Sequence, residues 1–174
     1  MTCRKVTEFG DDTKLVRDAF AQFPSGVSVL AFDLDGEHHA LVASSFMVGV
    51  SLDPVLVAVA VQKTSETWDK VLAADTIGVS IFGKGQGDLT RQLAGKDRAN
   101  RFTDVAVDVS ESNAVYIEDA ALWLECSIYQ VSEAGDHWMA LLEVHKIGVS
   151  GNEPLIWHGS RFRDLVAEST IDVA

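Results

Sequence analysis

Small hydroxyl residues stand where one predicted strand of this sequence ends and a loop begins. The candidate residues of this first segment are Ala43, Ser44, Ser45, Phe46, Ser51 and Leu52. Small side chains let a planar ligand lie against the backbone, whose N–H groups can bond ring carbonyls and nitrogens. An ordinary strand end with turn-forming Ser, Asp and Pro has the same composition, so both interpretations stay open.

Two further segments have the residue types of a phosphate site. The first opens a predicted helix and contains Lys63, Ser65 and Thr67. A helix start offers unpaired N–H groups and a positive dipole end to an anion, although simple N-capping would use the same residues. The second runs from Lys96 to Phe102 and includes Arg101 and Phe102, with three cations in seven residues. Arginine favours bidentate phosphate contacts, but a solvated loop is the alternative.

Two segments near the C-terminal end have residues that local structure does not fully explain. In Gly135-Asp136-His137 a tight turn accounts for the glycine and Asp136, but His137 needs another reason or is a plain surface histidine. Trp157, His158 and Arg161 surround a glycine. These residues could provide an aromatic wall and a cation beside a bound ring system. Alternatively, they could simply pack the last strand against the rest of the protein.

Composition limits the classes of function. The chain has 174 residues, 47% of them apolar, a net charge of −12 and a pI of about 4.6. We expect a single domain over residues 1–174 with its core at about 13–165. The acidic balance opposes binding to nucleic acid or to an anionic membrane surface. A phosphate-bearing ligand would therefore need a few local cations and backbone N–H groups.

The cysteines, the histidines and the apolar runs exclude further classes. Cys3 and Cys126 are the two cysteines, and we expect Cys126 to act as a small hydrophobe, a disulfide being the alternative. Adjacent His38 and His39 point to opposite faces of a strand, so no metal site is predicted. The N-terminus has no apolar stretch of signal-peptide length, and the run Val55–Val61 is too short to span a bilayer. These features predict a cytoplasmic protein.

The elements that must position these residues are mainly strands. Helical periodicity predicts helices over Asp11–Phe23, Thr64–Ala74 and Asp88–Leu93. Alternating or continuous apolar patterns predict strands over Val27–Phe32, His38–Met47, Val55–Val61, Ile77–Phe82, Ala121–Ser132, His137–Val149 and Leu155–Trp157. Asp35-Gly36 is typical of a hairpin turn between the first two strands. The pattern favours an antiparallel barrel decorated with short helices.

Taken in order, these segments resemble the flavin reductase-like, FMN-binding split-barrel family, which includes the reductase components of two-component flavin-dependent monooxygenases. The resemblance covers Leu15 to Phe162. It is carried by Leu15–Phe20, Phe23–Val27, Ser44–Phe46, Ser51–Pro54, Ser65–Thr67, Arg101-Phe102, Gly135–His137 and His158–Arg161. It implies a mainly β fold with short helices, namely a split β-barrel of Greek-key type.

The resemblance also implies roles for the candidate residues. The flavin ring would lie along residues 43–46 and beside Ser51 and Leu52, with Trp157, His158 and Arg161 near it. The phosphate would lie near residues 63–67 and Arg101-Phe102. Asp136 and the catalytic His137 would stand beside the nicotinamide.

The function implied is an NAD(P)H:flavin oxidoreductase that transfers hydride from NADH or NADPH to FMN or FAD. A homodimer is expected, with a separate flavin-dependent oxygenase as the partner that receives reduced flavin. Hydride transfer between two bound cofactors needs no protein nucleophile and no metal, which agrees with the lack of an acid–base constellation. The alternatives are a flavin-binding protein without turnover, for storage or electron transfer, and an oxidase of the pyridoxamine-phosphate type.

Overall fold

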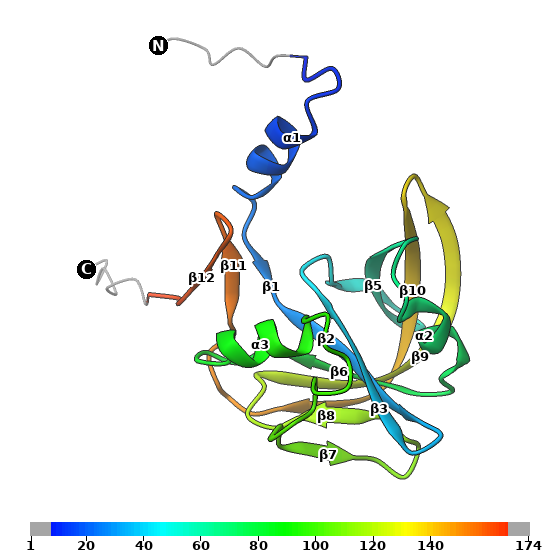
Figure 1. Cartoon of the computed structure of the whole chain (residues 1–174). Helices are drawn as coiled ribbons and strands as arrows, with labels where there is room; N and C mark the ends of the chain where they lie inside the picture. The colour runs from blue at the N-terminus through cyan, green and yellow to red at the C-terminus, as the bar shows by residue number, and fades with distance from the viewer. Residues whose placement is uncertain (1–7, 167–174) are drawn as a thin grey trace, which may run out of the picture.

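The computed structural model describes residues 8–166, so Cys3 lies outside the described residues. Antiparallel strands are the main regular structure, and the helices are short (Figure 1). Within residues 8–166, no helix has the length and apolar character needed to cross a membrane. The mainly β fold predicted from the sequence is confirmed.

Seven strands form the main sheet. They are β2 (Ser28–Leu34), β3 (Glu37–Ala43), β4 (Met47–Leu52), β5 (Val55–Gln62), β6 (Ile77–Ile81), β9 (Leu122–Ala134) and β10 (His137–Val149). Their order is β3-β2-β6-β9-β10-β5-β4, and every neighbouring pair is antiparallel. In the described part of the chain, the outermost strands β3 and β4 are not paired with each other, so the barrel is open along that side.

The sheet wraps around one core although its ends are unpaired. Leu41 of β3 and Val57 of β5, from opposite halves of the strand order, belong to the same buried cluster as Cys126 of β9. Burial raises the pKa of the Cys126 thiol to about 12, which keeps it protonated. Cys126 is therefore a buried apolar group, as predicted.

A second core covers the other face of β2. Val29 and Ala31 of β2 pack there against Val115 and Ile117, which explains why nearly all of β2 is buried. The ribbon that supplies Val115 and Ile117 consists of β7 (Val107–Val109) and β8 (Val115–Ile117), which the sequence analysis did not predict. A third, small sheet pairs β1 (Ser25–Gly26) with β11 (Ile156–His158) and β11 with β12 (Arg161–Arg163).

Gly78 of β6 shows how closely the ribbon approaches the main sheet. A Cβ atom at this position would lie 2.2 Å from the carbonyl oxygen of Val115. No side chain fits at that separation, so the sequence needs glycine here. The contact fixes β8 on the outer face of β6.

Both hairpins predicted from turn residues are present. Asp35 and Gly36, with φ of 56° and 82°, join β2 to β3. Gly135, with φ of 63°, and Asp136 join β9 to β10. The predicted strand His38–Met47 is wrong at its end, because β3 stops at Ala43 and the chain crosses over to pair Met47 with Ala58 of β5.

The helices are α1 (Thr13–Phe20), α2 (Trp68–Ala73) and α3 (Gly87–Leu93). Asp12 caps α1, its carboxylate accepting a hydrogen bond from the Leu15 N–H at 2.9 Å. The predicted start of the second helix at Thr64 is wrong, because α2 begins at Trp68. Residues 62–67 form turns instead, with the Ser65 N–H donating to the Gln62 carbonyl at 2.9 Å, and Thr67 precedes the helix without a side-chain cap.

Candidate functional site

The hydroxyl segment after β3 lies at a crossing between strands. The Ser28 hydroxyl donates to the Ala43 carbonyl at 3.0 Å, and the Ser45 hydroxyl donates to the Ala60 carbonyl at 2.7 Å. Ser45 thus ties the crossing to β5, while Ser44 is exposed and lines a cavity of about 420 Å³. Of the two serines, Ser44 is therefore the one that lines this cavity, while the Ser45 hydroxyl is engaged by β5.

Aromatic side chains form one wall of this first cavity. Trp157 of β11 and Phe162 of β12 meet edge to face, with ring centroids 5.1 Å apart. The guanidinium of Arg91 lies 4.9 Å from the Phe162 ring centroid, and Ala94 lies at the end of α3. Trp157 was predicted as an aromatic wall, and Phe162 belongs to the same C-terminal segment. Arg91 and Ala94 come from α3 and its C-terminal end, which were not expected at the site.

Cations gather at a second cavity of about 690 Å³. Its lining includes Ser65, Thr67, Lys96, Arg98 and Arg101. Arg98 forms an ion pair with Glu66 on the same rim. Ser65, Thr67 and Arg101, predicted phosphate residues from two distant segments, therefore face one hollow, whereas Lys63 and Phe102 do not line it.

Arg101 has a structural task in addition to its charge. Its guanidinium donates to the Gly95 carbonyl through Nε at 2.8 Å and through Nη2 at 2.6 Å, and to the Ala40 carbonyl at 3.0 Å. Burial, and then the nearby Arg98, lower the pKa of Arg101 below its ordinary value. The side chain clamps the loop after α3 onto β3 and presents its remaining N–H groups at the cavity.

His137 begins β10, directly after the hairpin turn. Its Nδ1 lies 2.7 Å from Oδ1 of Asp136. The hydrogen bond from His137, followed by its charge, holds the pKa of Asp136 below its usual value. Lys63, opposite this turn, pairs with Glu133 at 3.0 Å and lies 4.9 Å from the Trp138 ring centroid. Asp136 and His137 line a third cavity of about 410 Å³.

Shared residues connect the three cavities into one series. Ala94 lines both the first and the second cavity, and Gln62 lines both the second and the third. The series runs from Ser44 and Trp157, past the cations, to His137. Gln62 was not predicted, because only its position at the end of β5 sets it apart.

The other predicted residues lie outside the lining of these cavities. Phe46 packs against the barrel core. The Phe102 ring packs edge to face with the His38 ring, with the two ring centroids 5.4 Å apart. Ser51 accepts a hydrogen bond from the Asp53 N–H at 3.2 Å, and Leu52 is 84% exposed. His158 and Arg161 face each other as strand partners at the β11–β12 turn.

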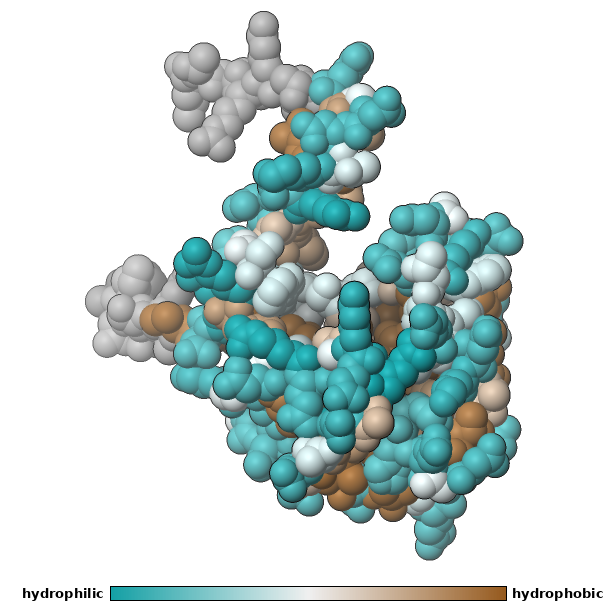
Figure 2. Space-filling model, in the orientation of Figure 1, coloured by the Kyte–Doolittle hydropathy of each residue, from teal (hydrophilic) through white to brown (hydrophobic). Residues whose placement is uncertain are grey.

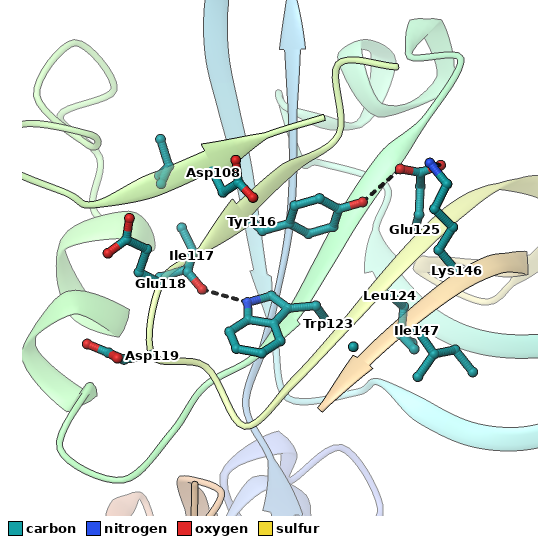
Figure 3. Close-up of a pocket in the computed structure, with 12 residues that line it drawn as sticks. Asp108, Tyr116, Ile117, Glu118, Asp119, Trp123, Leu124, Glu125, Lys146 and Ile147 are labelled. Atoms are coloured by element: carbon teal, nitrogen blue, oxygen red, sulfur yellow. Dashed lines mark hydrogen bonds and ion pairs between the residues drawn. The ribbon is translucent and has the colours of Figure 1, made fainter. Parts of the chain in front are cut away.

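A separate hollow of about 600 Å³ lies between β8 and the outer face of β9 and β10 (Figure 3). Several of its polar side chains already have hydrogen-bond partners. The Tyr116 hydroxyl donates to Glu125 at 2.8 Å, Lys146 donates to the same carboxylate at 2.8 Å, and the Trp123 N–H donates to the Ile117 carbonyl at 2.7 Å. None of the predicted site residues lines it.

The fold and the connected cavities define a strand-rich protein with an elongated series of hollows lined by aromatic, small and cationic side chains. A family model described as "Flavin reductase like domain" matches residues 20–166. The chain belongs to this family.

Individual relatives agree with that assignment. The chain is 30% identical to a flavin reductase of Pseudomonas putida, over 82% of this chain and 83% of that protein. It is 32% identical to the reductase component of the flavin-dependent trigonelline monooxygenase of Acinetobacter baylyi, over 91% of this chain but only 50% of that protein. The solved NADH:FAD oxidoreductase of Streptomyces globisporus superposes with a TM-score of 0.85 and 31% identity, over 95% of this chain and all of that one.

The residues of the first two cavities fit a flavin nucleotide. The aromatic wall of Trp157 and Phe162 and the small residues Ser44 and Ala94 suit a flat ring system. The cations of the adjoining second cavity suit the phosphate. A site built this way needs no large basic surface, in agreement with the acidic net charge of −12.

Proposed function

We propose that this protein is an NAD(P)H-dependent flavin reductase, working as one flavin reductase-like domain. The observation that carries the proposal is the connected series of cavities. Adjoining cavities are lined by Ser44 and Trp157, by Ser65, Thr67 and Arg101, and by Asp136 and His137, which supports the roles that the family resemblance implies for these residues. The Streptomyces relative named as an NADH:FAD oxidoreductase supports the same assignment.

In this proposal Ser44 and Trp157 hold the ring, and Ser65, Thr67 and Arg101 hold the phosphate. His137 orients the nicotinamide, its own ring being fixed by Asp136. The bound cofactors supply the chemistry, a hydride transfer from reduced nicotinamide to flavin. The protein contributes placement at reacting distance and exclusion of water, so no protein nucleophile is required.

A steady-state assay tests the function. FMN, FAD and riboflavin are each crossed with NADH and NADPH, and nucleotide oxidation is measured with catalytic amounts of protein. We expect flavin-dependent oxidation with at least one pair. Flavin uptake without nucleotide oxidation would instead favour a flavin-binding protein without turnover.

We also propose a separate flavin-dependent oxygenase as the acceptor of reduced flavin, because the Acinetobacter relative is named as the reductase component of a monooxygenase. Release of the product to a partner calls for moderate flavin affinity, since a tightly held product would stall turnover. A cytoplasmic location agrees with this role, because reduced nicotinamide nucleotides are cytoplasmic metabolites.

A homodimer is proposed from an exposed apolar strand. Strand β5 does not offer a subunit interface, because β4 and β10 flank it and its central residues are buried within one chain. The neighbouring edge strand β4 instead exposes apolar side chains, with Val48 60% and Leu52 84% exposed. A second copy of this chain would cover them.

A further inference from the structure

Helix α1 faces the β9–β10 turn across open space. The helix stands apart from the barrel (Figure 1), and the Gly159 N–H donates to the Ala21 carbonyl at 2.7 Å just after its end. Figure 2 shows a hollow between this projecting segment and the body of the molecule. The cavity of about 410 Å³ that contains His137 is the same space, lined on its other side by α1 and the residues before it.

The two walls of this cavity differ in chemistry. The α1 wall combines the apolar side chains of Phe9, Val16 and Phe20 with the guanidinium of Arg17. The opposite wall offers the Gln62 amide and the Asp136–His137 pair. One side thus suits a flat apolar ring and an anion, and the other supplies hydrogen-bonding groups.

Arg17 is the cation of this cavity that is free to meet an anion. Lys14, on the same helix, is held by Asp18 at 2.6 Å and does not line the cavity. Within residues 8–166, no carboxylate lies within ion-pair distance of Arg17. In a protein of net charge −12, an anionic ligand depends on such a local cation.

We propose that this cavity takes the adenosine diphosphate half of the nicotinamide nucleotide, with Arg17 binding its diphosphate. This inference rests on the proposed function, which places the nicotinamide beside His137. From Gln62, the strand partner of His137, the second cavity leads toward the cations assigned to the flavin phosphate, and the third leads toward α1. The rest of the nucleotide therefore extends to α1, where Phe9 and Phe20 offer an apolar surface for adenine.

Direct binding of ADP-ribose, which lacks the nicotinamide, tests the assignment without turnover. Calorimetric titration of the flavin-loaded protein compares wild type, Arg17→Gln and the matched control Lys14→Gln. We expect Arg17→Gln to weaken ADP-ribose binding about tenfold, the size of one lost charge-assisted hydrogen bond. Lys14→Gln should bind as the wild type does. Equal binding by Arg17→Gln and wild type would overturn the proposal.

Kinetics provide an independent readout. Arg17→Gln should raise KM for NADH about tenfold. Its KM for reduced nicotinamide mononucleotide, which lacks the adenosine half, should stay unchanged, as should its flavin Kd. An equal rise for both nucleotides would contradict the assignment. The assignment would also be contradicted if Arg17→Gln weakened the binding of 2′-phosphorylated ADP-ribose alone. Arg17 would then contact the 2′-phosphate and not the diphosphate.

The two proposals fail in different ways. If the wild-type protein oxidises no nicotinamide nucleotide with any flavin, the proposed function fails. If the wild type turns over and Arg17→Gln matches it in both assays, only the role of α1 is refuted.

Discussion

His137 lies at the first position of β10, and its ring is oriented by a carboxylate next to it in the chain. The 2.7 Å contact between its Nδ1 and Oδ1 of Asp136 holds one nitrogen of the imidazole. A ring held in this way can position a nicotinamide without taking part in proton transfer. Its removal should therefore affect nucleotide binding and leave flavin binding intact.

We expect His137→Ala to raise KM for the nicotinamide nucleotide several-fold, about the loss of one or two hydrogen bonds. The flavin Kd, measured by fluorescence quenching, should change by less than about twofold. His145→Ala is the matched control, because His145 lies on the same strand, is exposed, and bonds the Ser127 hydroxyl at 2.8 Å. An unchanged KM in His137→Ala would remove this residue from the nucleotide site.

At the residue scale, the sequence predicted site members whose types are unusual for their surroundings. His137 in a turn and Arg101 in an acidic chain stand out in this way. Gln62, Arg91 and Ala94 do not, because an end-of-strand glutamine and two helix residues are explained by their local structure. Their place in the site depends on how α3 and β5 pack, which sequence spacing does not encode.

At the element scale, β8, β9 and β10 are connected by the carboxylate of Glu125. Its side chain is buried and accepts hydrogen bonds from Tyr116 and Lys146, each at 2.8 Å (Figure 3). Burial alone would raise the pKa of Glu125, but the hydrogen bonds from Lys146 and Tyr116 outweigh it and the pKa is lowered. Burial and the same carboxylate raise the pKa of Tyr116.

The lowered pKa makes this network a pH-dependent source of stability. A carboxyl group whose pKa is lower in the folded state stabilises the fold above its unfolded pKa, about 4.3. That contribution disappears as pH falls through the folded pKa. We expect Glu125→Gln to reduce the free energy of unfolding by about 1–3 kcal/mol at pH 7. The difference from wild type should shrink steadily below about pH 5.

Urea unfolding at several pH values measures this difference. Glu133→Gln is the control, because Glu133 also pairs with a lysine, at 3.0 Å, but is well exposed. Exposed pairs contribute about 0–1 kcal/mol, so this variant should stay close to wild type. A Glu125→Gln effect that does not vary with pH would mean that shape, and not charge, matters at this position.

Element boundaries were predicted less well than the elements themselves. The long strands β9 and β10 have strong apolar patterns, and both were predicted. The strands β7 and β8 have three residues each, too few to show a period, and they are defined by the close approach of Val115 to Gly78. The start of α2 was also predicted too early. The Ser65 N–H takes part in a turn by donating to the Gln62 carbonyl, so Ser65 does not cap a helix.

At the scale of the whole molecule, the exposed edge strand β4 determines how copies of the chain would meet. We expect Val48→Asp to convert a dimer into a monomer, because a charge at the centre of an apolar interface costs about 2–5 kcal/mol. Light scattering coupled to size-exclusion chromatography measures the mass.

Leu72→Asp serves as the control for this prediction. Leu72 is an exposed leucine on α2, away from β4, so the variant adds the same charge to a different surface. It should keep the mass of the wild type. A monomeric wild-type protein, or a Val48→Asp variant that remains dimeric, would contradict an interface at β4.

The three cavities overlap only through Ala94 and Gln62, so the aromatic wall and helix α1 lie at opposite ends of the series. Two ligands arriving from those ends would not compete for the same approach. Each can dock or depart while the other remains bound. Such a layout favours a complex of three components over an exchange in which one ligand must vacate the protein first.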